Sequence, residues 1–234
     1  MLQERQKSIL HAVIQEYIRT AHPVASKELA RDSDWGLSPA TIRSELLALD
    51  EEGFLEQPHT SAGRVPTDKG YRYFVDHLPA DAGLTDSEEE LLREAFAIHQ
   101  ADTFIRAFAQ RVSKIAGAFV AAGMKREQAL YKSGFAAILE EPEFADPERA
   151  REFGRLADVL DAEIHRVLPR NRAQGRTWIG AENPWREAQQ YAITLVPWEH
   201  PRGFRGFISI VSPRRANYPK HQAIINLIRT TYDA

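Results

Sequence analysis

The sequence predicts an α+β fold in two parts, and three observations lead to that class. Through most of residues 1–167, apolar side chains recur at helical spacing, which is typical of helices with one buried face. After residue 175, short runs rich in β-branched and aromatic residues are bounded by Gly and Pro, which predicts strands. A helical pattern stops at Pro79 and small residues follow, so we expect a domain boundary near residue 78.

The first part begins with three predicted helices. The first follows an apolar stripe that starts at Ile9 and ends by Pro23, and the second is short and starts at Ser26. The third runs from Ser38, a suitable N-cap, to about Glu52. Its buried face is expected to consist of three apolar residues one turn apart, Ile42, Leu46 and Leu49.

A short strand at 54–56 and a loop at 57–66, punctuated by Pro and Gly, follow the third helix. Thr67 is placed to cap a fourth helix, whose apolar stripe contains Tyr71, Phe74, Val75 and Leu78. This order of elements favours a helix-turn-helix with a wing over residues 1–78. An ordinary three-helix bundle is the alternative.

The second part opens with two predicted helices, 87–99 and 102–117, and we interpret residues 79–120 as a helical linker. The apolar side of the second helix suits a dimer interface, but packing on its own domain explains it equally well. That side is formed by Phe104, Phe108, Val112, Ile115 and Phe119. A further helix is expected from Asp146-Pro147, strands at 177–179, 191–196 and 206–211, and a last helix near residues 224–228.

Composition excludes several classes of protein. The 234 residues are 43% hydrophobic and 27% charged, which fits one or two globular domains. The absence of cysteine excludes disulfides, iron–sulfur clusters, thiolate zinc sites and a Cys nucleophile, and it fits a reducing cytosol. The longest uncharged apolar stretch, 116–124, is too short to cross a bilayer, and the N-terminal residues lack a signal-peptide pattern. We therefore expect a cytoplasmic protein with no membrane partner.

Catalytic signatures are missing from the sequence. It contains no phosphate-binding Gly-rich loop, dinucleotide fingerprint, nucleophile elbow or paired-His zinc helix. The eight histidines never lie three or four residues apart, so no helix presents two of them on one face. The carboxylates at 88–90 and 140–141 are interpreted as solvated helix surface. We expect neither an enzyme nor a cofactor nor a metal site.

A DNA-binding surface is the functional feature that the first part predicts. In a helix-turn-helix the second helix of the motif reads base edges with its N-terminal residues, here Ser38, Pro39, Ala40, Thr41, Arg43 and Ser44. The loop offers hydrogen-bond donors suited to a wing along the duplex, and flanking lysines extend the same face: His59, Thr60, Ser61, Arg64, Lys27 and Lys69. The charge count is unfavourable, because the whole chain carries −3 and residues 1–78 hold nine Lys or Arg against twelve Asp or Glu.

Several runs of residues resemble one family. The segments Pro23-Val24-Ala25-Ser26-Lys27 and Leu37-Ser38-Pro39-Ala40-Thr41-Ile42-Arg43, and above all the run PHTSAGRVPTDKGYR at 58–72, resemble the winged-helix domain of the HrcA heat-inducible transcription repressors. The resemblance covers residues 2–76. Residues 139–146, 179–183 and 212–219 resemble the closing motifs of the same family, which lie in its GAF-like domain. A long middle section of the family, including a dimerising insertion, is nearly absent between about residues 124 and 130.

The resemblance implies a winged helix-turn-helix at 1–78, a helical linker at 79–120 that offers dimerisation helices, and a truncated GAF-like α+β domain at 121–234. It further implies a homodimeric repressor that binds an inverted-repeat operator in double-stranded DNA ahead of chaperone genes, with the chaperonin GroEL helping to keep it active. Two alternatives remain. The GAF-like domain would bind a small effector while the winged helix regulates another operon, or the chain would be a protein-interaction module that no longer binds DNA.

Overall fold

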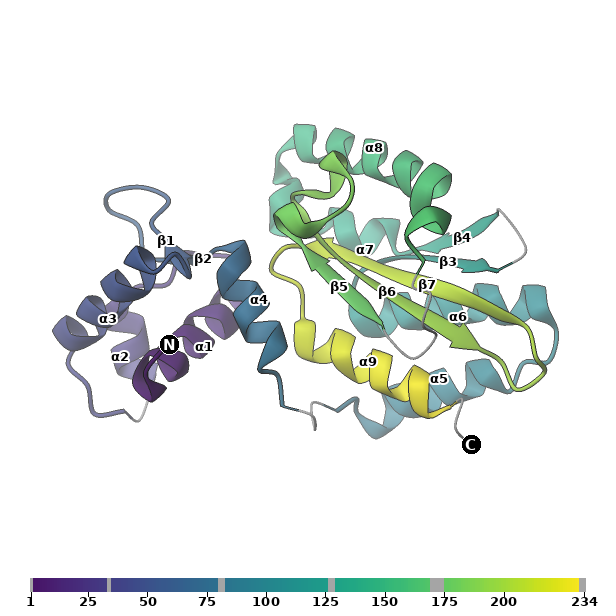
Figure 1. Cartoon of the computed structure of the whole chain (residues 1–234), viewed down its shortest axis with the longest axis horizontal. Helices are drawn as coiled ribbons and strands as arrows, with labels where there is room; N and C mark the ends of the chain where they lie inside the picture. The colour runs from purple at the N-terminus through teal and green to yellow at the C-terminus, as the bar shows by residue number, and fades with distance from the viewer. Residues whose placement is uncertain (1, 33–34, 80–82, 126–128, 169–174, 232–234) are drawn as a thin grey trace. The chain divides into compact units, whose positions relative to one another are not determined.

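The computed structural model describes residues 2–32, 35–79, 83–125, 129–168 and 175–231, and it confirms the α+β class (Figure 1). The chain divides into two compact units, Met1–Leu78 and Pro79–Ala234. Each unit has its own buried core. Within the described ranges, no helix is both long enough and apolar enough to cross a membrane.

The first unit contains four helices and a two-stranded antiparallel sheet. In chain order these are α1 (Glu4–Thr20), α2 (Ser26–Asp32), α3 (Pro39–Glu51), β1 (Leu55–Glu56), β2 (Val65–Pro66) and α4 (Asp68–Asp76). The helix signals in the sequence are confirmed. The Ser38 hydroxyl accepts a hydrogen bond from the Thr41 backbone N–H, Pro39 occupies the first helical position, and Thr67 caps α4 through the Gly70 N–H.

The core of the first unit is formed by one face of each long helix. The predicted stripe of α3 is buried, and it packs against α1 and α2, while α4 packs against α1. The largest contributions to this core come from Ile9, Leu10, Val13, Ile14, Ile42, Leu46, Leu49, Tyr71 and Phe74. Burial of one face fixes which face of α3 is left to the solvent.

A five-stranded antiparallel sheet forms the centre of the second unit, in the order β4-β3-β7-β6-β5. The three predicted strands are confirmed as β5 (Arg176–Ile179), β6 (Tyr191–Glu199) and β7 (Arg205–Pro213). The sequence pattern did not predict β3 (Phe119–Met124) and β4 (Leu130–Ser133). It also placed Phe119 on a helix, which was wrong, because the left-handed backbone of Gly117 (φ 61°) ends α6 and Phe119 begins β3.

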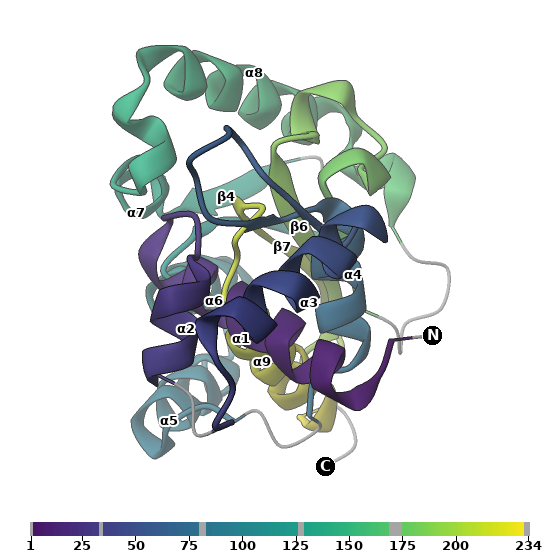
Figure 2. The same cartoon turned by 90° about the vertical axis from the view of Figure 1, so that its left-hand side faces the viewer.

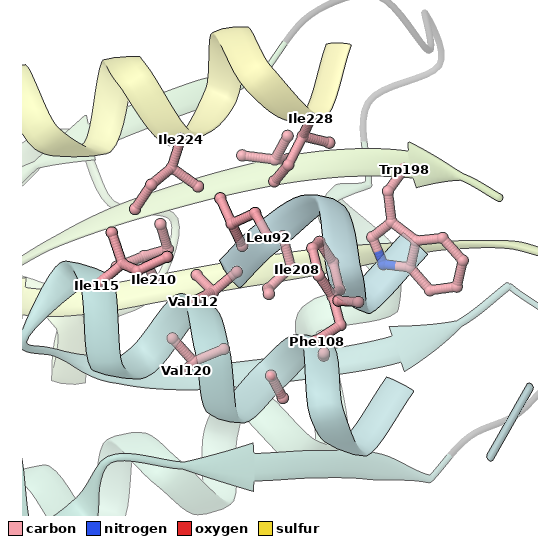
Figure 3. Close-up of a cluster of buried hydrophobic side chains, with 14 of the residues drawn as sticks. Leu92, Phe108, Val112, Ile115, Val120, Trp198, Ile208, Ile210, Ile224 and Ile228 are labelled. Atoms are coloured by element: carbon pink, nitrogen blue, oxygen red, sulfur yellow. The ribbon is translucent and has the colours of Figure 1, made fainter. Parts of the chain in front are cut away.

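Helices cover both faces of this sheet (Figure 1). On one face lie α5 (Asp86–Phe96), α6 (Ala101–Ala116) and α9 (Tyr218–Thr230), whose apolar side chains pack against the sheet residues Val120, Trp198, Ile208 and Ile210 (Figure 3). On the other face lie α7 (Phe135–Leu139), α8 (Pro147–Glu163) and short 3₁₀ turns at Pro142–Ala145, Ile164–Val167, Gly180–Glu182 and Arg186–Ala188. The result is a three-layer unit.

The interpretation of residues 79–120 as a linker with a dimerising face is corrected by these contacts. Phe104 and Phe108 are fully buried, and the Phe104 ring lies 5.0 Å from the Trp198 ring, between centroids. The apolar side of α6 faces the sheet and forms part of the core between them. Because the sheet already covers these side chains, they offer no exposed face to a second copy of the chain.

Candidate nucleic-acid interface

The exposed side of α3 carries most of the residues predicted to read DNA. Ala40, Arg43 and Ser44 are exposed, as are Ser38 and Pro39 at the helix start. Thr41 is only partly exposed, and its hydroxyl lies 2.9 Å from the Ser38 hydroxyl. It therefore completes the cap of the helix.

Leu47 shares this exposed side and was missed by the sequence analysis. Its side chain is 50% exposed, although the neighbouring residue Leu46 belongs to the core. Positions 40, 43, 44 and 47 follow the i, i+3, i+4, i+7 spacing of one helix face. The same spacing that identified the buried stripe would have placed Leu47 among the outward residues.

Two of the three acidic residues of α3, Glu45 and Asp50, are paired with cations from other segments, and the third, Glu51, is exposed at the helix end. The Nε of Arg5, at the start of α1, donates to the Glu45 carboxylate at 2.7 Å. Asp50, in the last turn of α3, forms an ion pair with Arg64, and the distance between Asp50 Oδ2 and Arg64 Nε is 2.8 Å. Arg43 is consequently the one charged side chain that is exposed between positions 40 and 47 of α3. The first unit has an excess of acidic residues, but the exposed side of α3 between positions 40 and 47 does not.

The loop between β1 and β2 presents three of its predicted residues to the solvent. His59, Thr60 and Ser61 are exposed at the tip. The Gln57 side-chain amide shapes the tip by donating to the backbone carbonyls of Thr60 and Ala62, at 3.1 and 2.9 Å. Figures 1 and 2 show this loop extending beyond the helices of the first unit.

The base of the loop is attached to the start of α2. Val24 and Arg64 exchange two backbone hydrogen bonds, each 2.9 Å long. Gly63 lies so close to the Val24 carbonyl that a Cβ at position 63 would overlap it. Glycine is therefore required here by close approach of two backbone segments. This attachment fixes the loop relative to α2, and Arg64 fixes it relative to α3.

Two of the cations predicted to contact DNA, Arg64 and Lys69, interact with groups of the protein itself. The Arg64 side chain is 13% exposed and pairs with Asp50. The Lys69 ammonium donates to the Glu52 carbonyl at 2.6 Å and lies 4.2 Å from the centre of the Phe54 ring. Both cations hold the loop and α4 against the end of α3. Lys69 is nevertheless exposed, as is Lys27 on α2.

In the second unit, the segments that resemble family motifs make contacts that hold loops together. The Arg215 guanidinium, which is largely buried, pairs with the carboxylates of Glu141 and Glu143 and so joins the end of β7 to the turn after α7. The Asn183 amide nitrogen lies 2.9 to 3.0 Å from three backbone carbonyls, those of Gly180, Ala188 and Tyr191. These contacts tie loops together at the ends of strands.

Each unit contains a hollow lined by side chains. In the first unit, α1 and α4 border a cavity of about 450 Å³ whose lining includes Trp35 and Tyr73. In the second unit, a cavity of about 340 Å³ is lined by charged and amide side chains of α8 and of residues 186–190. The described part of the chain holds no cluster of three potential metal ligands.

Comparison with known proteins gives matches to HrcA proteins. A family model described as "HrcA protein C terminal domain" matches residues 72–221. The heat-inducible transcription repressor HrcA of Symbiobacterium thermophilum is 43% identical over 135 residues, which cover 56% of this chain and 40% of that protein. The HrcA repressor of Carboxydothermus hydrogenoformans is 52% identical over 96 residues, which cover 41% of this chain and 28% of that protein. The chain thus matches less than half the length of these curated relatives.

A solved structure shares the fold along the whole chain. The crystal structure of a hypothetical protein aligns with a TM-score of 0.74 and covers 100% of this chain and 98% of its own. The sequences are 15% identical, so the likeness concerns the fold alone.

Proposed function

The chain belongs to the HrcA family, whose model covers more than half of it, and on this premise we propose that it is a transcription repressor that binds double-stranded DNA through its first unit. The proposal treats α2 and α3 as a helix-turn-helix and the loop between β1 and β2 as a wing. The curated relatives named in the comparison are heat-inducible transcription repressors.

The single observation that carries this proposal is the exposed side of α3. A DNA major groove accepts a helix whose first turns present small or hydrogen-bonding groups and no unpaired carboxylates. Here Ala40, Arg43 and Ser44 form that face, while the carboxylates of Glu45 and Asp50 are paired with arginines. The pairing supports DNA binding despite the net charge of the unit.

The pairing also changes the role proposed for some residues. Direct contacts are assigned to exposed side chains on α2, α3 and the loop tip: Lys27, Ser38, Ala40, Arg43, Ser44, His59, Thr60 and Ser61. Arg64 and Lys69 are proposed to position the wing, because their cationic groups already have partners. Pro39 is assigned to the helix start and Thr41 to the cap.

Membership of the HrcA family also supports a proposal for the whole protein. We propose a cytoplasmic homodimer that binds an inverted repeat ahead of heat-shock chaperone genes, with GroEL modulating its activity and the second unit acting as a GAF-like regulatory domain. Two-fold symmetry of the protein matches two-fold symmetry of the operator. A dimer also doubles the number of phosphate contacts, which compensates for the few free cations of one unit.

The test is a titration of the full chain against the family's inverted repeat and against a scrambled duplex of equal length, followed by fluorescence anisotropy over a salt series. We expect tighter binding to the repeat by at least about a thousandfold at physiological salt. Equal, weak and salt-sensitive binding to both duplexes, with and without added GroEL, would reject this inverted repeat as the target and leave a different operon or a protein-interaction role.

A second candidate function concerns a small effector and rests on the cavity in the second unit. Its lining combines Arg155 and Arg186 with Glu152 and Glu187, which suits a polar ligand that carries both charges or several hydrogen-bonding groups. In that case the first unit would regulate a different operon. A ligand that raises the melting temperature of the full chain, and fails to do so when Arg186 is replaced by Ala, would favour this candidate.

A further inference from the structure

Leu47 is an unusual residue in the first unit. Its isobutyl group is 50% exposed, and among the described residues of that unit it is the one large apolar side chain with such exposure. The neighbouring apolar positions of α3, at 42, 46 and 49, are all buried. A single exposed leucine on a surface is common, so exposure alone assigns no function to Leu47.

The place of Leu47 on α3 is the C-terminal end of the face proposed to enter DNA. Leu47 follows Arg43 and Ser44 by one turn, and these side chains lie next to one another on the helix surface. Glu45 points to Arg5 instead, and the exposed Glu51 comes one turn later. The face between Ala40 and Leu47 therefore offers one cation, one hydroxyl and one large apolar group.

Each of these groups has a counterpart in the major groove. An arginine matches guanine or a phosphate, and a serine hydroxyl matches either kind of base edge. The C5-methyl group of thymine is the apolar feature of that groove, and it distinguishes thymine from every other standard base. An isobutyl group at position 47 matches a methyl group, and it gains nothing from contact with a polar edge or a phosphate.

We propose that Leu47 determines sequence specificity by contacting one or more thymine methyl groups in each operator half-site. The assignment rests on the proposed function, because it requires α3 to lie in the major groove. It adds a direct base contact to a face whose other members also contact the DNA backbone. Removal of one contacted methyl group is expected to weaken binding about fourfold, which is the usual effect of exposing one buried carbon.

The experiment replaces thymine by deoxyuridine, which keeps the Watson–Crick edge and removes only the methyl group. Each thymine of the half-site is replaced in turn, symmetrically in both halves of the inverted repeat, and Kd is measured for the wild-type chain and for Leu47→Ala. Leu139→Ala is the matched control, because Leu139 is 44% exposed but lies on α7 in the second unit. A thermal melt of each variant checks that it is folded.

We expect at least one thymine at which symmetric replacement by deoxyuridine weakens wild-type binding about fifteenfold, since one methyl group is lost from each half-site, but changes binding of Leu47→Ala by less than about 1.5-fold. The Leu139→Ala variant should behave as the wild type does. If deoxyuridine raises Kd by the same factor for Leu47→Ala and for the wild type at every position, the assignment of Leu47 is wrong. DNA binding by α3 would then still stand. If the wild-type chain does not prefer the inverted repeat to a scrambled duplex, the proposed function fails, and this assignment fails with it.

Discussion

Arg64 Nε lies 2.8 Å from Asp50 Oδ2, so a residue at the base of the loop is fixed to the last turn of α3. The two segments are the proposed wing and the proposed recognition helix. Both side chains are less than one-third exposed, so solvent and salt screen this ion pair less than a pair on the open surface. The contact couples the positions of two surfaces that would have to meet DNA together.

Replacing Arg64 by Ala is expected to weaken DNA binding about tenfold through loss of this coupling, and to lower the free energy of unfolding of the first unit by about 1 kcal/mol. Asp50→Ala should have a similar effect on stability. Hydrogen exchange of α3 amides would measure the stability, and anisotropy would measure the binding.

The double variant distinguishes positioning from direct contact. If Arg64 acts through Asp50, the effects of the two substitutions on Kd are not additive, and the double variant binds about as well as Arg64→Ala alone. Fully additive effects would assign Arg64 a direct phosphate contact. Such a result would restore the role that the sequence alone predicts for this arginine.

Arg43→Ala tests the charged member of the α3 face. We expect Kd for the operator to rise about tenfold or more, because Arg43 is exposed and is the nearest cation to the proposed base-reading surface. A phosphate contact predicts a salt slope reduced by about one and an equal loss on any sequence, whereas a guanine contact predicts lower selectivity. Arg19→Ala, at the far end of α1, is the control and should leave Kd unchanged. Equal Kd values for the Arg43 variant and the wild type at low salt would contradict the interface.

Gly63→Ala tests the attachment of the loop to α2. A methyl group at position 63 would overlap the backbone carbonyl of Val24, which cannot move aside without breaking the two hydrogen bonds between residues 24 and 64. We expect the first unit to lose about 2 kcal/mol of stability. Gly154→Ala is the matched control, because position 154 lies within α8 and has open space around it. That substitution should raise the stability of the second unit by up to about 1 kcal/mol. Thermal melts would then show a lower melting temperature for Gly63→Ala and a higher one for Gly154→Ala.

The sequence predicts the helices of the first unit well because their signals are local. Ser38 and Pro39 mark the start of α3, and the spacing of Ile42, Leu46 and Leu49 marks its buried face. The role of Arg64 is not predictable in this way, since its partner Asp50 lies fourteen positions earlier and meets it only after the hairpin forms. A sequence pattern identifies a cation, and tertiary structure decides whether its charge is available.

In the second unit, the missed strand β3 has a different cause. Residues 119–124 are apolar on both sides, because the strand lies inside the sheet between β4 and β7 and helices cover both faces. Such a strand lacks the alternation that reveals a half-exposed one, and a short apolar run is equally compatible with the end of a helix. The same burial explains why the apolar side of α6 resembled an interface: its partner, the sheet, was not recognised.

His221 gives the second unit a dependence on pH. Its ring is buried on α9, with Nδ1 3.4 Å from the Thr194 hydroxyl, and burial lowers the pKa of this histidine to about 4. In the unfolded chain the pKa is near 6.5, so below that pH the unfolded state binds a proton that the folded state does not. The contribution to stability is complete above pH 6.5 and decreases as the pH falls towards 4, by up to about 3 kcal/mol.

Urea denaturation of the full chain between pH 4 and 7.5, followed by tryptophan fluorescence, measures this decrease, because three of the four tryptophans lie in the second unit. In His221→Leu the free energy of unfolding should change less with pH over this range. Some dependence will remain, since burial also lowers the pKa of His200. If His221→Leu retains the full dependence, the proton is taken up by other groups, and the buried state of His221 does not limit stability at low pH.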